Sequence, residues 1–217
     1  ALPAPAPPPP NTDPVLILNT FLVLCLVPLA HAHGSQLLGF FAAAALFGAL
    51  GFSVIPMGLG WAVGWANEDT MLNTAAASGC LLALAAAART TPQGTRLLAP
   101  FQLGVSVFGT LCLLLAGLIR TSRWYPTKPG AALGYVGANV GYAALLLAMV
   151  AWGALGGSMS VYSTAATFTA LYLSDKAVEW CVFTGLGWVA VLLVSVGLCG
   201  GAWFIHTHPT WLVSMLR

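Results

Sequence analysis

The stretch LLAPFQLGVSVFGTLCLLLAGLI, residues 97–119, lies between Arg96 and Arg120 and carries no charge. A helix rises about 1.5 Å per residue, so this run is long enough to cross the roughly 30 Å hydrocarbon core of a bilayer. We therefore predict a transmembrane helix here. The rest of the chain agrees, because only 6% of its 217 residues are charged. Soluble domains have about 25%, so we expect the bilayer to be the solvent of this protein.

Five further apolar segments are predicted to span the membrane. They cover residues 14–30, 37–66, 71–88, 131–155 and 180–205. The segment 158–179 is half polar and its apolar part is too short to span alone, so we predict an interfacial or re-entrant helix there. The predicted fold is an all-α, polytopic membrane bundle of about six transmembrane helices plus one short interfacial helix. Seven spans is the alternative.

The chain divides into a proline-rich N-terminal arm (1–13), a transmembrane bundle (14–205) and a short C-terminal tail (206–217). The arm, which begins ALPAPAPPPP, would form a polyproline II helix in water. Such a segment loses little entropy on docking, so we expect it to lie across a neighbouring subunit. The chain does not begin with Met, from which we expect a removed presequence and either import into an organelle or export across a membrane.

Charged side chains are predicted only in loops and at the rims of the bundle. A charge inside the bilayer is costly and usually functional, so the lack of one argues against a proton pump or an ion-coupled transporter. A net charge of +2 without a basic run argues against a nucleic-acid partner. No nucleophile, carboxylate pair or phosphate loop is recognisable, so we predict no enzymatic activity. With six spans, Lys176 would lie across the membrane from Arg120 and Arg123.

Four histidines occur as two H-x-H pairs, His31 with His33 and His206 with His208. Two residues apart on a helix, the rings of one pair point about 200° apart, so a single pair does not chelate a metal and we predict no metal site. Six spans would place the pairs on opposite faces, about 30 Å apart, whereas seven would place them on one face. We interpret them as polar rim residues, with ligation of a pigment or haem as the alternative.

Neutral amides within the predicted spans are the second set of candidate binding residues. An unpaired amide in hydrocarbon costs several kcal/mol, so we expect most of them to hydrogen-bond between helices. The alternative is that an amide binds a chlorophyll magnesium or lines a polar pocket. Gln102 and Asn139 are the candidate cofactor-binding amides, and Asn73 would join them in the pocket of a transporter.

Glycines spaced four residues apart are the most regular pattern in the chain. Helix backbones approach closely at such pairs. We predict helix packing at Gly60/Gly64, Gly137/Gly141, Gly153/Gly157 and Gly197/Gly201. The phrases GWAVGWA (60–66) and GANVGYA (137–143) are nearly identical, and we expect them to pack against each other. The alternative is a close approach of the backbone to a lipid or a pigment ring.

Together these features predict a non-catalytic accessory subunit of a large organellar energy-converting complex, photosynthetic or respiratory. It would lie in a thylakoid or mitochondrial inner membrane, contact other membrane subunits partly through its arm, and help to bind chlorophyll, a carotenoid, haem or structural lipids. The phrase LAHAHGSQLLG (29–39) is similar to the histidine–glycine turn of the photosystem I subunit L family, although the number of spans differs. The alternatives are a small-solute or lipid transporter and a haem-binding redox protein.

Overall fold

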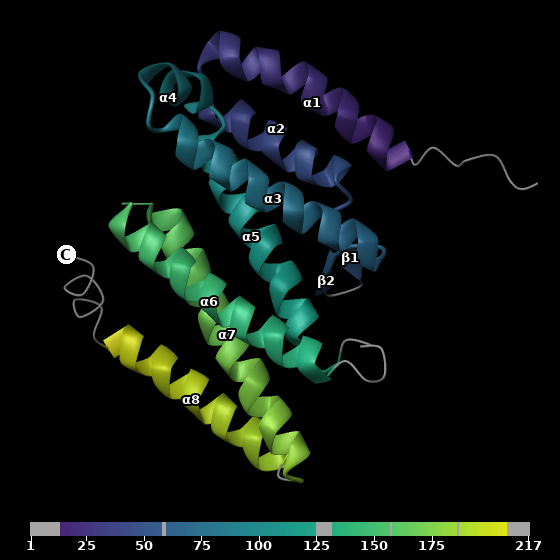
Figure 1. Ribbon diagram of the computed structural model, residues 1–217, viewed down its shortest axis with the longest axis vertical. Helices are drawn as coiled ribbons and strands as arrows, with labels where there is room; N and C mark the ends of the chain where they lie inside the picture. Colours follow the sequence, from purple (N-terminus) through teal and green to yellow (C-terminus); the bar gives the residue numbers. More distant parts are fainter. Residues whose placement is uncertain (1–13, 58–59, 125–131, 157, 186, 208–217) are drawn as a thin grey trace, which may run out of the picture.

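The computed structural model describes residues 14–57, 60–124, 132–156, 158–185 and 187–207 (Figure 1). These residues form eight α-helices and one β-hairpin. The elements in chain order are α1 (Pro14–His33), α2 (Gln36–Ala49), β1 (Ser53–Met57), β2 (Gly60–Gly64), α3 (Glu68–Ala88), α4 (Pro92–Leu98), α5 (Gln102–Thr121), α6 (Ala132–Leu155), α7 (Met159–Phe183) and α8 (Gly187–Thr207). The proline-rich arm and most of the C-terminal tail lie outside the described residues.

Four of the described helices are long and apolar enough to cross a membrane: α1, α3, α5 and the part of α6 from Gly134 to Leu155. The prediction of a helical membrane bundle is confirmed at this level, and the count of six spans is wrong. Helix α2 has 14 residues, which is about 21 Å at 1.5 Å per residue and too short to span. The predicted segment 180–205 is divided, because its first residues complete α7 and α8 begins at Gly187.

The predicted span 37–66 breaks at Gly51. This residue has φ +91°, a conformation that glycine adopts without steric cost. The chain leaves α2 there, and the N–H of Phe52 closes the helix end by donating to the carbonyl of Phe47. The prediction rested on the length of an uncharged run and allowed only a kink at Pro56, so it overestimated the helix.

A β-hairpin follows and replaces the second half of that predicted span. Strands β1 and β2 pair antiparallel, with Ser53 opposite Gly64 and Met57 opposite Gly60. Pro56 has no N–H to continue a helical ladder, and the hydroxyl of Ser53 donates to the carbonyl of Gly64 at 3.2 Å. Gly60 and Gly64 therefore lie in a strand and do not join two helices, which corrects the prediction for this pair.

Apart from the short α4, successive helices alternate in direction, so the bundle has two ends (Figure 1). The Arg89 end is where α1 and α3 finish and where α2, α5 and α7 begin. The Glu179 end carries the hairpin, the last turn of α5, the first turns of α6 and the last turns of α7. Helix α5 is central, since it packs against α2, α3, α6 and α7. Its span is 44% buried, compared with 6% for α1 at the edge.

Helix α7 contains the segment 158–179 and continues beyond it. It is an unbroken helix of 25 residues that packs against α5, α6 and α8, so the prediction of a short interfacial helix is wrong. Its threonines do not break it because each hydroxyl donates to a carbonyl one turn earlier, as Thr164 does to Ser160 at 2.8 Å. Lys176 consequently lies at the Glu179 end, on the same side as Arg123 and not opposite it.

The core is built where α3, α5, α6 and α7 meet. Its buried residues are Leu82, Leu114, Tyr142, Leu146, Met149, Val161, Ala165 and Phe168. The hydroxyl of Tyr142 donates to the carbonyl of Leu114 at 2.8 Å, which pairs a polar group that the apolar core would otherwise leave unsatisfied. A smaller cluster of Phe47, Phe52 and Cys112 joins α2 to α5. This packing holds α5, α6 and α7 in the register that brings their polar residues together.

Candidate functional site

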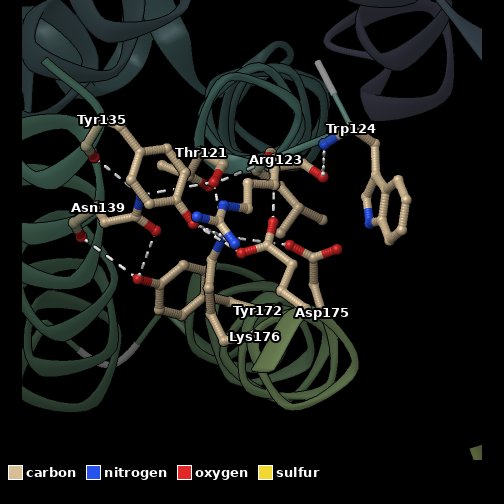
Figure 2. Close-up of polar contacts among 11 residues, drawn as sticks. Thr121, Arg123, Trp124, Tyr135, Asn139, Tyr172, Asp175 and Lys176 are labelled. Carbon is tan, nitrogen blue, oxygen red and sulfur yellow. Dashed lines mark hydrogen bonds and ion pairs between the residues drawn. The ribbon is translucent and has the colours of Figure 1, made fainter. Parts of the chain in front are cut away.

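Charged residues of α7 gather at the Glu179 end of the bundle (Figure 2). Tyr172, Asp175, Lys176 and Glu179 recur at three- and four-residue spacings along α7, so they share one face of the helix. That face contacts the last turn of α5 and the first turns of α6. We call this set, together with the groups it bonds on α5 and α6, the polar cluster.

Lys176 is the centre of the polar cluster. Its Nζ donates to the carbonyl of Thr121 at 2.6 Å and to Oε2 of Glu179 at 2.8 Å. The same nitrogen lies 3.3 Å from the hydroxyl of Tyr135 and 3.4 Å from Oδ2 of Asp175. An ammonium group has three protons to donate, so the surrounding acceptors satisfy it completely. The contact with Thr121 also binds one of the free carbonyls at the C-terminus of α5.

Glu179 is the most buried charge of the polar cluster, with 5% of its side chain exposed. Its Oε2 accepts from Lys176 and from the hydroxyl of Tyr135, the latter at 2.7 Å. Its Oε1 accepts from the backbone N–H of Arg123. Both carboxylate oxygens are thus occupied by donors from α6, α7 and the chain that follows α5. Glu179 joins three segments that are distant in sequence.

Asn139, a candidate cofactor ligand from sequence, belongs to the polar cluster. Its Nδ2 donates to the carbonyl of Tyr135 at 2.9 Å and lies 3.5 Å from that of Thr121. Its Oδ1 accepts from the hydroxyl of Tyr172 at 3.1 Å. The amide therefore hydrogen-bonds between helices, as expected for most polar residues in the spans. Both ends of its side chain already have protein partners.

The pKa values in the polar cluster follow from burial and from these hydrogen bonds. Burial would raise the pKa of Glu179, but hydrogen bonds from Lys176, Tyr135 and the Arg123 N–H outweigh it and hold the pKa below its usual value. Burial would lower the pKa of Lys176, but its bonds to Glu179 and Tyr135 raise it. Burial raises the pKa of Asp175, and the charge of Glu179 raises it further. Lys176 and Glu179 are therefore held as an ion pair at neutral pH.

A recess of about 200 Å³ adjoins the polar cluster and is lined by Arg123, Tyr135, Glu179, Trp180 and Phe183. The guanidinium of Arg123 lies 5.0 Å from the centre of the Phe183 ring, a cation–π contact. The hydrogen bonds of Lys176 and Glu179 hold α5, α6 and α7 together beside this recess.

The two amides predicted as candidates lie far apart. Gln102 is the first residue of α5, at the Arg89 end, where it lines a second recess. Asn139 contacts Thr121, the last residue of α5. Asn73 is exposed on α3. The three amides therefore do not form the common pocket that the transporter alternative predicted.

The histidines do not converge in the part of the chain that the structure describes. His31 and His33 are exposed at the end of α1. Helix α8, which includes His206, lies on the opposite flank of the bundle (Figure 1), while His208 is outside the described residues. The structure thus places the ends of α1 and α8 toward the same end of the bundle, but with the other helices between them. Among the described residues, no group of three or more His, Cys, Asp or Glu could hold a metal ion.

The predicted packing glycines have different surroundings. A Cβ added to Gly153 would lie 2.6 Å from the backbone nitrogen of Tyr162, so α6 and α7 approach closely there. Gly137, Gly141 and Gly197 have no described heavy atom within 4 Å of such a Cβ. The phrases at 60–66 and 137–143 therefore do not pack against each other through Gly137 and Gly141. Gly201 lies in α8, and Gly157 is outside the described residues.

Sequence reasoning missed the polar cluster because it took 158–179 for a short interfacial helix and placed Lys176 across the membrane from Arg123. The signal was present: Tyr172, Lys176 and Glu179 have the four- and three-residue spacing of one helical face. A helix that continues through residue 179 puts all three on that face. The partners Tyr135 and Thr121 could not be found in this way, since only tertiary packing brings them to α7.

Comparison with family models, with curated protein sequences and with solved structures gives no match to this chain. The class is therefore defined by the fold alone. Four apolar helices of membrane-spanning length, packed around α5, make this a multi-span helical membrane protein.

Proposed function

We propose that this chain is a non-catalytic structural subunit of a larger membrane assembly, attached to a neighbouring subunit through the outer face of α6. One observation carries the proposal. Gly137, Gly141, Ala144 and Ala148 are all exposed and follow one another at spacings of four, three and four residues, which places them in a straight line along the helix.

One flank of this line is large and apolar. Val136 is 59% exposed, Val140 64% and Leu147 70%. A groove of small residues beside such a ridge lets a second transmembrane helix approach closely and gain dispersion contacts. Lipid tails fill such a groove less completely, because they are mobile and do not match its shape. The face thus fits a partner helix better than it fits lipid.

The inner face of α6 supports the same role. It is fixed to α5 by the hydroxyl of Tyr142, and to α7 by the bond of Tyr135 to Glu179 and by the bond of Asn139 with Tyr172. A helix held in this way presents its outer face in one orientation. Pre-organisation of this kind lowers the entropy lost on association.

The host complex and any cofactor are proposed from the sequence alone. The host would be a photosynthetic or respiratory complex of a thylakoid or mitochondrial inner membrane, with the proline-rich arm as a second attachment. Chlorophyll or haem would bind at the histidine pairs, whose ring nitrogens can ligate its metal, and a carotenoid would be held by apolar contacts. An absorbance spectrum of the isolated assembly tests this part, because each pigment class has its own bands.

Blue-native electrophoresis of gently solubilised native membrane tests the main proposal. The wild-type chain is expected to migrate in a large band containing other subunits, identified by mass spectrometry. The double variant Gly137→Ile/Gly141→Ile fills the groove, and we expect it to leave that band. Gly79→Ile on α3 is the matched control, because a Cβ there also meets no atom within 4 Å, and it should stay in the band. Retention of the double variant, or migration of the wild type as a monomer or homo-oligomer, would contradict the proposal.

A further inference from the structure

A recess of about 250 Å³ opens at the Arg89 end, opposite the polar cluster. Its polar lining comes from α2, from the end of α3, and from the first turns of α5 and α7, namely Gln36, Arg89, Gln102, Ser106, Ser158 and Ser160. The proposed function uses none of these residues. The lining contains a cation and several hydrogen-bond donors but no carboxylate.

Arg89 is the cation of this recess and has no counter-ion. Its Nε is buried without a hydrogen-bond partner, and Arg89 forms no ion pair with any described residue. The described carboxylates all lie toward the other end, on the first turn of α3 or the last third of α7. A guanidinium is always charged and matches the geometry of a phosphate or carboxylate. The Nε has no exposed surface, so the terminal Nη groups, which make no hydrogen bond to the described residues, are the donors left for an anion in the recess.

Ser106 is a second donor without a partner. It is only 6% exposed, yet its hydroxyl makes no hydrogen bond to the described residues. Ser78 on α3, by contrast, bonds one turn back to the carbonyl of Thr74 at 2.6 Å. The Ser106 side chain lines the recess. A ligand acceptor there can take the hydrogen bond that the described residues leave unmade.

Two long helices begin at the recess and add to its positive character. Helix α5 starts at Gln102 and α7 at Met159, and neither has a side chain capping its N-terminus. The first N–H groups of a helix lack intrahelical partners, and the helix dipole favours an anion there. Arg89, Ser106 and two uncapped helix starts thus point to the same kind of ligand.

We propose that this recess binds the phosphate group of an anionic phospholipid. The recess lies between the last residue of the α3 span and the first residue of the α5 span, which is the level of lipid headgroups. A second crevice that also contacts Arg89, lined by Ala85, Leu98 and Val105 among others, has only about 10 Å³. That crevice holds no more than one water, so the larger recess is the phosphate site. This inference does not depend on the proposed assembly.

The test uses the full-length chain in micelles of a neutral detergent, to which phosphatidylglycerol, phosphatidylcholine or inorganic phosphate is added. Binding is followed as the rise in the thermal unfolding midpoint with ligand concentration. We expect phosphatidylglycerol to stabilise the wild type. Arg89→Gln should weaken its apparent affinity by about tenfold or more, the value of one hydrogen bond between charged groups.

Arg96→Gln is the matched control, because Arg96 is exposed on α4 at the same end and its loss changes the net charge equally. Its affinity should change less than about twofold, since exposed charges contribute little. Equal losses in the two variants would mean diffuse attraction and would overturn the site. Equal stabilisation by phosphatidylcholine, or by inorganic phosphate, would overturn the assignment to an anionic lipid.

Ser106→Ala provides a second test that does not alter charge. It removes one donor and leaves the helix intact, so the affinity for phosphatidylglycerol should fall about threefold to tenfold. This variant decides the question if Arg89→Gln does not fold. An unchanged affinity in Ser106→Ala would then contradict the proposed site.

Discussion

The two ends of the bundle treat charge in opposite ways. At the Glu179 end, Lys176 and Glu179 are bonded to each other and to Tyr135, and both atoms of the carboxylate have donors. At the Arg89 end, the buried Nε of Arg89 has no partner. A charge that is hydrogen-bonded by the protein contributes to folding, whereas a charge without protein partners is available to bind a ligand of opposite charge. This difference separates structural from binding residues better than residue type does.

The largest expected effect comes from breaking the ion pair. Lys176→Met should lower the free energy of unfolding by about 3–5 kcal/mol, because it leaves the buried carboxylate of Glu179 without its cation. Chemical denaturation in detergent micelles measures the change. The double variant Lys176→Met/Glu179→Gln should recover part of the loss, since no unpaired charge remains. A loss below about 1 kcal/mol in the single variant would mean that the pair behaves like an exposed one.

A smaller effect is expected from removing one hydrogen bond to the carboxylate. Tyr135→Phe should cost about 1.5–3 kcal/mol, the usual value for a bond to a charged group. Tyr162→Phe is the control, because no hydrogen bond of its hydroxyl to the described residues is seen, and it should change the stability by less than about 0.5 kcal/mol. Equal effects of the two substitutions would mean that the hydroxyl of Tyr135 does not contribute to stability through Glu179.

The pH dependence of the stability should also report the ion pair of Lys176 and Glu179, with a smaller effect. The pKa of Glu179 is lower in the folded protein, so its contribution is present above the ordinary glutamate pKa of about 4.3 and is lost as the pH falls through the folded value. Asp175 works in the opposite direction, because its pKa is raised on folding. Wild-type stability should therefore decline in acid, and Glu179→Gln should flatten that decline. An identical acid limb in both proteins would show that Glu179 does not control it.

The sequence predicted the class of the protein because charge content alone excludes a soluble surface. It also placed α1, α3, α5 and α6 to within a few residues, since each is an apolar run of spanning length. It failed at 37–66, where one glycine with positive φ ends a helix inside an apolar run, and at α7. There the threonines made the segment look polar, although each hydroxyl is satisfied by its own helix.

The candidate sites were harder to predict than the fold. Asn139 was recognised as a polar residue that needs a partner, and it has several. Its partners Thr121 and Tyr172 lie on other helices, and no local pattern relates them to it. The Arg89 recess depends on three separate helix starts meeting at one end of the bundle. These starts lie at one end because successive helices alternate in direction. The wrong number of predicted spans assigned the helix ends to the wrong sides, so the recess could not be predicted.

The measurement that tests this account most directly is the thermal unfolding midpoint of Lys176→Met and Arg89→Gln, each with and without phosphatidylglycerol. Lys176→Met should lower the midpoint equally in both conditions. Without lipid, Arg89→Gln should change the free energy of unfolding by less than about 1 kcal/mol, so its midpoint should stay close to that of the wild type. With phosphatidylglycerol, the midpoint of this variant should not rise. If Arg89→Gln were the more damaging without lipid, or if Lys176→Met abolished the lipid effect, the contrast between the two ends would be contradicted.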